Sequence, residues 1–248
     1  MQVRRSTMDA SAVKMIKGKS PLKASQKLRE ALQQRGHTPG SITFFYSAKN
    51  DRDIVVPSDI QFTHVLDLES DETVRAYDID PARVYGHIQG QGYKGSKPDA
   101  HVTKHSGRTC LVEVKYRVEI NTPRAVIQAD IQKQAAAAIG ADWTWYTDDD
   151  VTRHARVIND WLHIAPVLYQ MRWDLASVWE PLTTDIIEQV RDEPATLGAL
   201  ESRHREQWAL AFSAIWRLVQ RGVLASDLAL QPLSPATTLT WVQGHGIQ

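Results

Sequence analysis

Two short runs of strand-forming residues near the middle of the chain constrain its fold more than any other feature. Residues 100–104 and 109–114 are both rich in β-branched and apolar side chains, and His105-Ser106-Gly107-Arg108 separates them. Runs of this length on either side of a glycine-containing turn predict the two arms of a β-hairpin. The chain is therefore expected to build its centre on an antiparallel strand pair.

The second arm of this hairpin carries charged residues among apolar ones. Because side chains alternate along a strand, Glu113 and Lys115 should point to one face while Val112 and Val114 point into the core. Asp99 precedes Glu113 by thirteen intervening residues and stands at the start of the partner arm. Pairing of the arms should bring Asp99 to the same spot, so two carboxylates and an amine are expected together.

Pro98-Asp99 followed by Glu113-Val114-Lys115 has the form of a PD-(D/E)xK nuclease motif. Asp99 and Glu113 would offer Mg²⁺ the hard oxygen ligands it prefers, and the ion can neutralise a phosphate and activate water. Lys115 would hold the attacking water and offset charge that develops on the phosphate. The same short motif also occurs where an ordinary turn is followed by a solvated strand edge. The elements around it must therefore decide between the two interpretations.

Helices and strands alternate around the hairpin. Ser58 is a helix N-cap with Gln61 three residues later, and another helix is expected from Pro123 to about Ile139. Short strands are expected over 42–46, 74–77, 84–88 and 143–146, and an apolar patch lies at 54–56, whereas Gly90, Gly92 and Gly95 indicate a loop. This order predicts an α/β fold with a restriction-endonuclease-like, mixed-sheet core.

From about residue 166 the pattern becomes helical. Helices are expected over 182–190, 197–204 and 207–220, followed by two short apolar alternations at 227–231 and 237–241. Three helices followed by a β-hairpin are typical of a winged helix. We therefore expect a nuclease domain over 1–165 and a winged-helix domain over 166–248, whose apolar third helix favours protein docking over base reading.

Charge and composition limit how such a protein could bind nucleic acid. Lys and Arg number 29, as do Asp and Glu, so no overall field attracts DNA and any binding surface must be local. A basic arm is expected at the start of the chain, either solvated or in contact with phosphates. Its cations are Arg4, Arg5, Lys14, Lys17, Lys19, Lys23, Lys27 and Arg29.

Other polar groups have simpler interpretations. The acids between Asp59 and Asp80 are expected on a solvated helix face. The polar residues Gln128, Gln132, Lys133 and Gln134 would either contact the DNA backbone or form one side of an amphipathic helix. The lone Cys110 excludes an intrachain disulfide, and no apolar run is long enough to span a membrane, so a cytoplasmic protein is expected.

Several separated blocks resemble the TnsA endonuclease subunits of heteromeric bacterial transposases. The similarity covers roughly residues 42–165 and extends more loosely towards the C-terminal end. The blocks are Tyr46-Ser47 with Lys49, Ser58 to Gln61, Val74 with Tyr77 and Pro81, Asp99 with Glu113-Val114-Lys115, 143–148 and 158–162. The resemblance implies hydrolysis of the 5′, non-transferred strands of double-stranded DNA at transposon ends. It also implies Mg²⁺, or Mn²⁺, as cofactor, and a DDE-type, TnsB-like transposase and an AAA+, TnsC-like ATPase as partners.

One position departs from the family pattern. Where the family usually has a glutamate on the helix that begins at Ser58 here, this chain has Gln61, whose amide oxygen can ligate a metal but carries no charge. The metal ligands implied are therefore Asp99, Glu113 and Gln61, with Lys115 beside the water. Two alternatives stay open at this point: a stand-alone PD-(D/E)xK nuclease, and a catalytically degenerate subunit that serves assembly or DNA binding.

Overall fold

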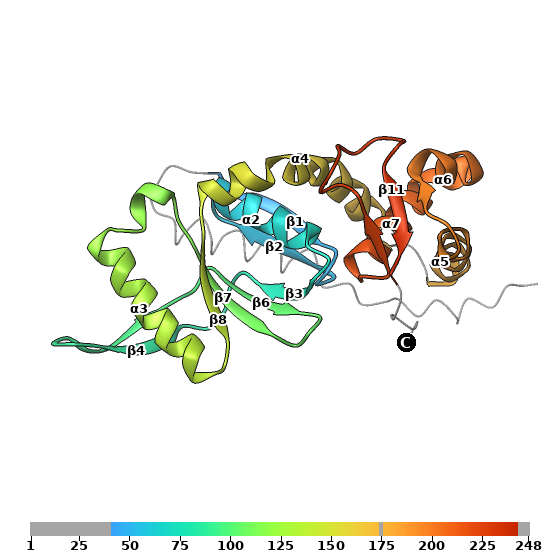
Figure 1. The fold of residues 1–248 in the computed structure, drawn as a ribbon. Coiled ribbons are helices and arrows are strands. Elements are labelled where there is room, and N and C mark those ends of the chain that lie inside the picture. The colour runs from blue at the N-terminus through green and yellow to red at the C-terminus, as the bar shows by residue number, and fades with distance from the viewer. Residues whose placement is uncertain (1–40, 174–175, 243–248) are drawn as a thin grey trace, which may run out of the picture. The chain divides into compact units, whose positions relative to one another are not determined.

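The computed structural model describes residues 41–173 and 176–242 (Figure 1). The basic arm expected in the first thirty residues lies outside the described residues. The described part contains six α-helices and a mixed sheet, which confirms the predicted α/β class. The strands are β1 (Thr43–Ser47), β2 (Arg52–Val56), β3 (Val74–Asp78), β4 (Val84–Ile88), β5 (Gly92–Ser96), β6 (Ala100–Lys104), β7 (Thr109–Val114), β8 (Asp142–Tyr146), β9 (Ala195–Thr196), β10 (Leu224–Ser226) and β11 (Thr238–Trp241). The helices are α2 (Asp59–Ser70), α3 (Pro123–Ala138), α4 (Asp148–Gln170), α5 (Ala176–Arg191), α6 (Leu197–Arg203) and α7 (Trp208–Gln220).

The central sheet has the strand order β3-β6-β7-β8. The predicted hairpin is present as β6 and β7, which pair antiparallel with Ala100 opposite Val112. On its other side β7 pairs in parallel with β8, placing Glu113 opposite Trp145. The strand that carries the charged residues therefore lies inside the sheet, with a neighbour on each side.

One face of this sheet packs against α2 and the β1–β2 hairpin. The apolar residues Val112 and Val114 of β7 lie in this core with Val65 of α2 and Ile54 of β2. The helix begins as predicted, because the Ser58 side chain accepts a hydrogen bond from the backbone N–H three residues later. Burial of this face leaves the charged residues of β7 on the opposite face.

The opposite face is covered by α3, and the β4–β5 hairpin packs against the same helix (Figure 1). The loop predicted after residue 90 is wrong in part, since Gly92–Ser96 is a strand paired with β4. Gly90 and Gly92 have φ angles of 75° and 71° and form the tight turn instead. A Cβ atom on Gly86 would lie 3.0 Å from the Ile131 Cα atom, so this glycine permits the close approach of strand and helix.

The C-terminal region is joined to the sheet region by α4, which runs without a break across the boundary expected at 165/166. After it come α5, α6 and α7, with a three-stranded antiparallel sheet in the order β10-β11-β9. The prediction of a strand over 227–231 is wrong, because the first strand of this hairpin is Leu224–Ser226. Asp227 follows that strand, and its side chain accepts a hydrogen bond from the Thr238 backbone N–H.

An apolar cluster connects the C-terminal helices to α4 and α2. Trp161 of α4 and Trp216 of α7 are buried in it with edge-to-face rings, as expected for core tryptophans. Leu66 of α2 belongs to the same cluster. Within the described part of the chain, no helix has both the length and the apolar character that crossing a bilayer would require.

Candidate active site

The β6–β7 hairpin brings Asp99 to the charged face of β7, as predicted. The Asp99 backbone N–H donates to the Val112 carbonyl at 2.9 Å, and the Val114 N–H donates to Asp99 Oδ2 at 2.8 Å. These two bonds fix both the backbone and the carboxylate of Asp99 against the neighbouring strand. The site therefore depends on strand pairing rather than on a loop conformation.

Glu113 and Lys115 lie on the same face of β7, as alternation predicts. Lys115 Nζ lies 3.1 Å from Glu113 Oε1. The glutamate side chain is only 2% exposed, whereas the lysine side chain is 27% exposed. The Lys115 backbone N–H donates to the Tyr146 carbonyl of β8 at 3.0 Å, which holds the end of the strand. A buried acid is thus paired with a cation that reaches solvent.

Gln61 enters the site from the first turn of α2. Its Nε2 donates to Asp99 Oδ1 at 2.6 Å, and its Oε1 accepts from the Ser58 hydroxyl at 3.1 Å. The Gln61 backbone N–H also donates to Ser58 Oγ at 3.3 Å. Gln61 therefore contacts both the helix cap and the acid of the site.

The electrostatics of the site reflect two neighbouring acids. Burial, followed by the negative charge of Glu113, raises the pKa of Asp99 to about 6. The Val114 N–H, the Lys115 charge and the Gln61 amide act in the opposite direction without cancelling the rise. A second cation placed between the carboxylates would relieve this repulsion, which is the property expected of a cation-binding pair.

Gln132 of α3 is a member of the site that the sequence analysis did not identify. It is fully buried, with an exposed fraction of 0%. Its Nε2 donates to Glu113 Oε2 at 2.7 Å and to the Ser96 hydroxyl at 2.9 Å, and its Oε1 accepts from the Trp143 indole at 2.9 Å. Gln132 therefore orients the buried glutamate. Its burial fits neither of the two alternatives given for it, contact with the DNA backbone or a place on the polar side of an amphipathic helix.

A signal for this role was present in the sequence. Gln132 lies at helical spacing in a stripe of small buried residues, Ala125, Ala129 and Ala136. A glutamine in a buried stripe needs hydrogen-bond partners inside the protein. Gln134, two residues further along, instead binds the β4 backbone: it accepts from the His87 N–H at 2.9 Å and donates to the His87 carbonyl at 3.0 Å.

The chemistry of the donor set fits a hard divalent cation. Asp99 and Glu113 offer carboxylate oxygens, and Gln61 offers an amide. No cluster of three or more His, Cys, Asp and Glu side chains suited to a metal occurs among residues 41–173 and 176–242. An ion such as Mg²⁺, which retains several of its waters, is compatible with this small set. To present its oxygen, Gln61 must turn its amide, and the Ser58 hydroxyl can accept as well as donate.

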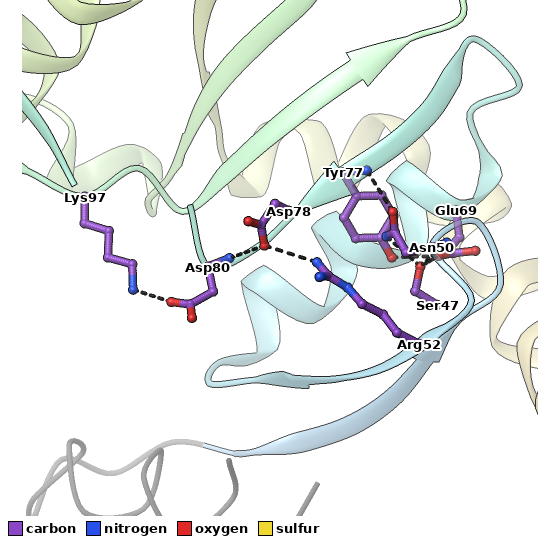
Figure 2. A network of polar contacts seen from close by, with 8 residues as sticks. All are labelled: Ser47, Asn50, Arg52, Glu69, Tyr77, Asp78, Asp80 and Lys97. Carbon is purple, nitrogen blue, oxygen red and sulfur yellow. Dashed lines mark hydrogen bonds and ion pairs between the residues drawn. The ribbon is translucent and has the colours of Figure 1, made fainter. Parts of the chain in front are cut away.

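A second buried carboxylate, Glu69 of α2, lies in a separate polar network (Figure 2). The Ser47 and Tyr77 hydroxyls donate to its Oε1 at 2.5 and 2.6 Å, and Gln220 Nε2 of α7 donates to its Oε2. Glu69 is 1% exposed, so the prediction that the acids between Asp59 and Asp80 form a solvated face is wrong for this residue.

The figure also shows polar contacts that lead from β2 and β3 towards the segment before Asp99. Arg52 Nη2 lies 3.1 Å from Asp78 Oδ1, which also accepts from the Asp80 N–H at 3.1 Å (Figure 2). Asp80 in turn pairs with Lys97. These contacts connect β2 and β3 with the segment that precedes β6.

Comparison of the chain with models of protein families and with curated proteins gave no match.

Proposed function

We propose that the chain hydrolyses DNA phosphodiester bonds at the site formed by Asp99, Glu113 and Lys115. The observation that carries the proposal is the meeting of a partly exposed lysine with two carboxylates. Lys115 Nζ lies 3.1 Å from the buried Glu113, and the charge of Glu113 helps to raise the pKa of Asp99 to about 6. Perturbed acids beside a cation are typical of reactive sites.

Each residue of the site has a role in this proposal. Asp99 and Glu113, with Gln61 as a weaker ligand, would hold Mg²⁺ or Mn²⁺, which when bound supplies positive charge to the phosphate and acidifies water. Lys115 donates to the attacking water and offsets charge on the phosphate oxygens. Gln132 keeps Glu113 in one orientation, as ligand-supporting residues commonly do.

We further propose that the chain is the endonuclease subunit of a heteromeric cut-and-paste transposase, cutting the 5′ strands at transposon ends. In support of this role, the blocks that resemble TnsA come together around one sheet, in β1, α2, β3, β6, β7, β8 and α4. We assign the sheet region to a restriction-endonuclease-like core on the same grounds. Its proposed partners are a TnsB-like transposase and a TnsC-like ATPase.

The C-terminal region is proposed to be a winged helix. The order α5, β9, α6, α7, β10 and β11, with the three strands in one antiparallel sheet, supports this assignment. Helix α7 would be its third helix, yet Trp216 and most of its apolar side chains are buried. A buried third helix cannot enter a DNA groove, which favours docking of a partner protein by this region.

The experiment that tests the proposal compares the purified chain alone with the chain supplemented by its transposase and ATPase partners, on supercoiled donor DNA with Mg²⁺. The proposed role predicts 5′-strand cuts at the element ends only when the partners are present. Cutting by the chain alone at other sites would identify a stand-alone nuclease. Absence of 5′ cuts under both conditions, with partner-dependent DNA binding retained, would identify a degenerate assembly subunit, in keeping with Gln61.

A further inference from the structure

The β4–β5 hairpin has one packed face and one open face. Gly86 of β4 and Ser96 of β5 are buried on the side of α3, where Gly86 approaches the helix backbone and Ser96 accepts from Gln132. In the paired register, Tyr85 lies opposite Gly95 and His87 lies opposite Tyr93. Because side chains alternate, these residues share the face turned away from α3.

The open face combines exposed aromatic rings with a cation. Tyr85 and Tyr93 are 63% and 79% exposed, and His87 packs edge-on against Tyr93 with ring centroids 5.6 Å apart. The Arg83 side chain crosses Gly95, whose carbonyl accepts from Arg83 Nη1 at 3.1 Å. A Cβ atom on Gly95 would lie 2.9 Å from atoms of both Arg83 and Tyr85, so the glycine leaves room for these two side chains.

Charge on this segment is of one sign. No aspartate or glutamate occurs between Asp80 and Asp99, whereas Arg83, Lys94 and Lys97 all lie within that stretch. Lys97 pairs with Asp80. Of the two cations left on the hairpin, Arg83 lies on the open face, whereas Lys94 is opposite Gly86 and shares the side of α3. In a chain with equal numbers of acidic and basic residues, this is a local surface that would attract a polyanion.

The hairpin is also continuous with the candidate active site. Ser96, its last residue, accepts a hydrogen bond from Gln132, which donates to Glu113 as well. Asp99 follows Ser96 by three residues. A strand of DNA whose phosphate lies at Asp99 would therefore have its flanking nucleotides close to the base of the hairpin.

We infer that the open face of the β4–β5 hairpin, formed by Arg83, Tyr85, His87 and Tyr93, holds the DNA duplex that flanks the scissile phosphate. This inference rests on the proposed function and names the surface that binds the DNA substrate beside the site. A two-stranded ribbon fits the major groove of DNA. Arginine guanidinium groups and tyrosine hydroxyl groups are frequent donors to phosphate oxygens, and aromatic rings add contact area on sugars and bases.

The test measures binding of the full-length chain to a fluorescently labelled DNA duplex by anisotropy, with EDTA present so that no strand is cut. The double variant Tyr85→Ala/Tyr93→Ala should bind about tenfold more weakly than wild type. Its thermal unfolding should be unchanged, because both rings are largely exposed. Phe44→Ala, which removes a half-exposed ring from β1, is the matched control and should bind like wild type.

Salt dependence gives a second readout of the same surface. If Arg83 neutralises a phosphate, Arg83→Gln should reduce the slope of log affinity against log salt by about 1. The exposed Arg205, near the start of α7, provides the charge-matched control, and Arg205→Gln should leave the slope unchanged. Loss of slope in both variants would indicate a diffuse field and would overturn the assignment to the hairpin.

The outcomes separate this inference from the proposed function. If the double tyrosine variant binds duplex as tightly as wild type and cutting is intact, the assignment of DNA binding to the hairpin is overturned, while the proposed nuclease function is retained. If that variant binds duplex more weakly but wild type cuts DNA under no condition, DNA binding by the hairpin is supported and the proposed nuclease function is rejected. Failure of the wild-type chain to bind duplex at all would overturn the inference.

Discussion

Glu69 and Glu113 are both almost fully buried, yet their surroundings differ. The side chains that donate to Glu69 are neutral and come from three elements besides its own: Ser47 of β1, Tyr77 of β3 and Gln220 of α7. The Lys49 ammonium also attracts its charge, but that ammonium bonds to the Asp71 and Val74 carbonyls. Glu113 instead shares its site with a second acid, Asp99, and bonds to Lys115. One carboxylate is closed off by its donors, whereas the other belongs to a charged group that reaches solvent.

The difference shows that burial alone does not identify a reactive acid. A buried carboxylate whose oxygens are satisfied by neutral groups ties distant segments together, and Glu69 does so between α2 and α7. A buried carboxylate beside a like charge and an accessible amine can bind a cation and act on a substrate. We therefore expect changes around Glu69 to affect stability and changes around Glu113 to affect activity.

The largest effect is expected from removing the charged groups of β7. Glu113→Ala and Lys115→Ala should each lower 5′-strand cutting by roughly 100-fold or more, because transition-state charge loses its stabilisation. Gel analysis of cut donor DNA measures this. Gln61→Glu is the control, which restores the acid usual in the resembled family and should keep or raise cutting. Wild-type cutting by both alanine variants would contradict the assigned site.

A smaller loss of activity is expected when the orientation of Glu113 is disturbed. Gln132→Leu keeps the volume of the side chain but removes its hydrogen bond to Glu113, so cutting or metal affinity should fall roughly 10- to 100-fold. Titration of Mn²⁺ followed by calorimetry gives the affinity directly. Gln134→Leu, on the exposed side of the same helix, should leave the affinity unchanged, and an equal loss in both variants would contradict a positioning role.

At the Glu69 network the expected effect is on stability. Ser47→Ala removes the hydroxyl that donates to Glu69 at 2.5 Å and should lower the free energy of unfolding by about 1–3 kcal/mol. Urea denaturation measures the change, while cutting at a temperature below the transition should match wild type. A loss of cutting in a fully folded variant would break the distinction between the two carboxylates.

The smallest expected effect is a change in how stability depends on pH. Burial raises the pKa of the Glu69 carboxyl in the folded chain above its unfolded value. The corresponding stabilisation is fully present below the unfolded pKa, about 4.3, and is lost as the pH rises through the folded pKa. Glu69→Gln removes the titration, so wild type should lose stability relative to the variant as pH rises through this window. Parallel stability curves would contradict the prediction.

Local rules predicted much of the central structure and of the site. Strand alternation and a four-residue turn were enough to place Asp99, Glu113 and Lys115 together, and Ser58 marked the start of α2. The Glu69 network was not predictable in this way. Its donor Gln220 lies 151 residues further along the chain, and no sequence pattern reports which distant amide will meet a given acid.

Two other differences between the predicted and the observed structure have local causes. Glycines made β5 resemble a loop, although pairing with β4 and packing on α3 override their low strand propensity. In the alanine-rich α3 the buried and exposed sides differ little in hydrophobicity, so Gln132 could not be told from the exposed Gln134 by polarity alone. Spacing relative to Ala129 and Ala136 was the more informative signal.

The most direct test of the nuclease site compares wild type with Asp99→Ala in the reaction containing supercoiled donor DNA, Mg²⁺ and the transposase and ATPase partners. The wild-type reaction should release a fully excised element. With the variant, only the strand assigned to the transposase should be cut, and the 5′ strand should stay intact. Identical products from the two proteins would contradict the nuclease site and leave the chain as an assembly factor.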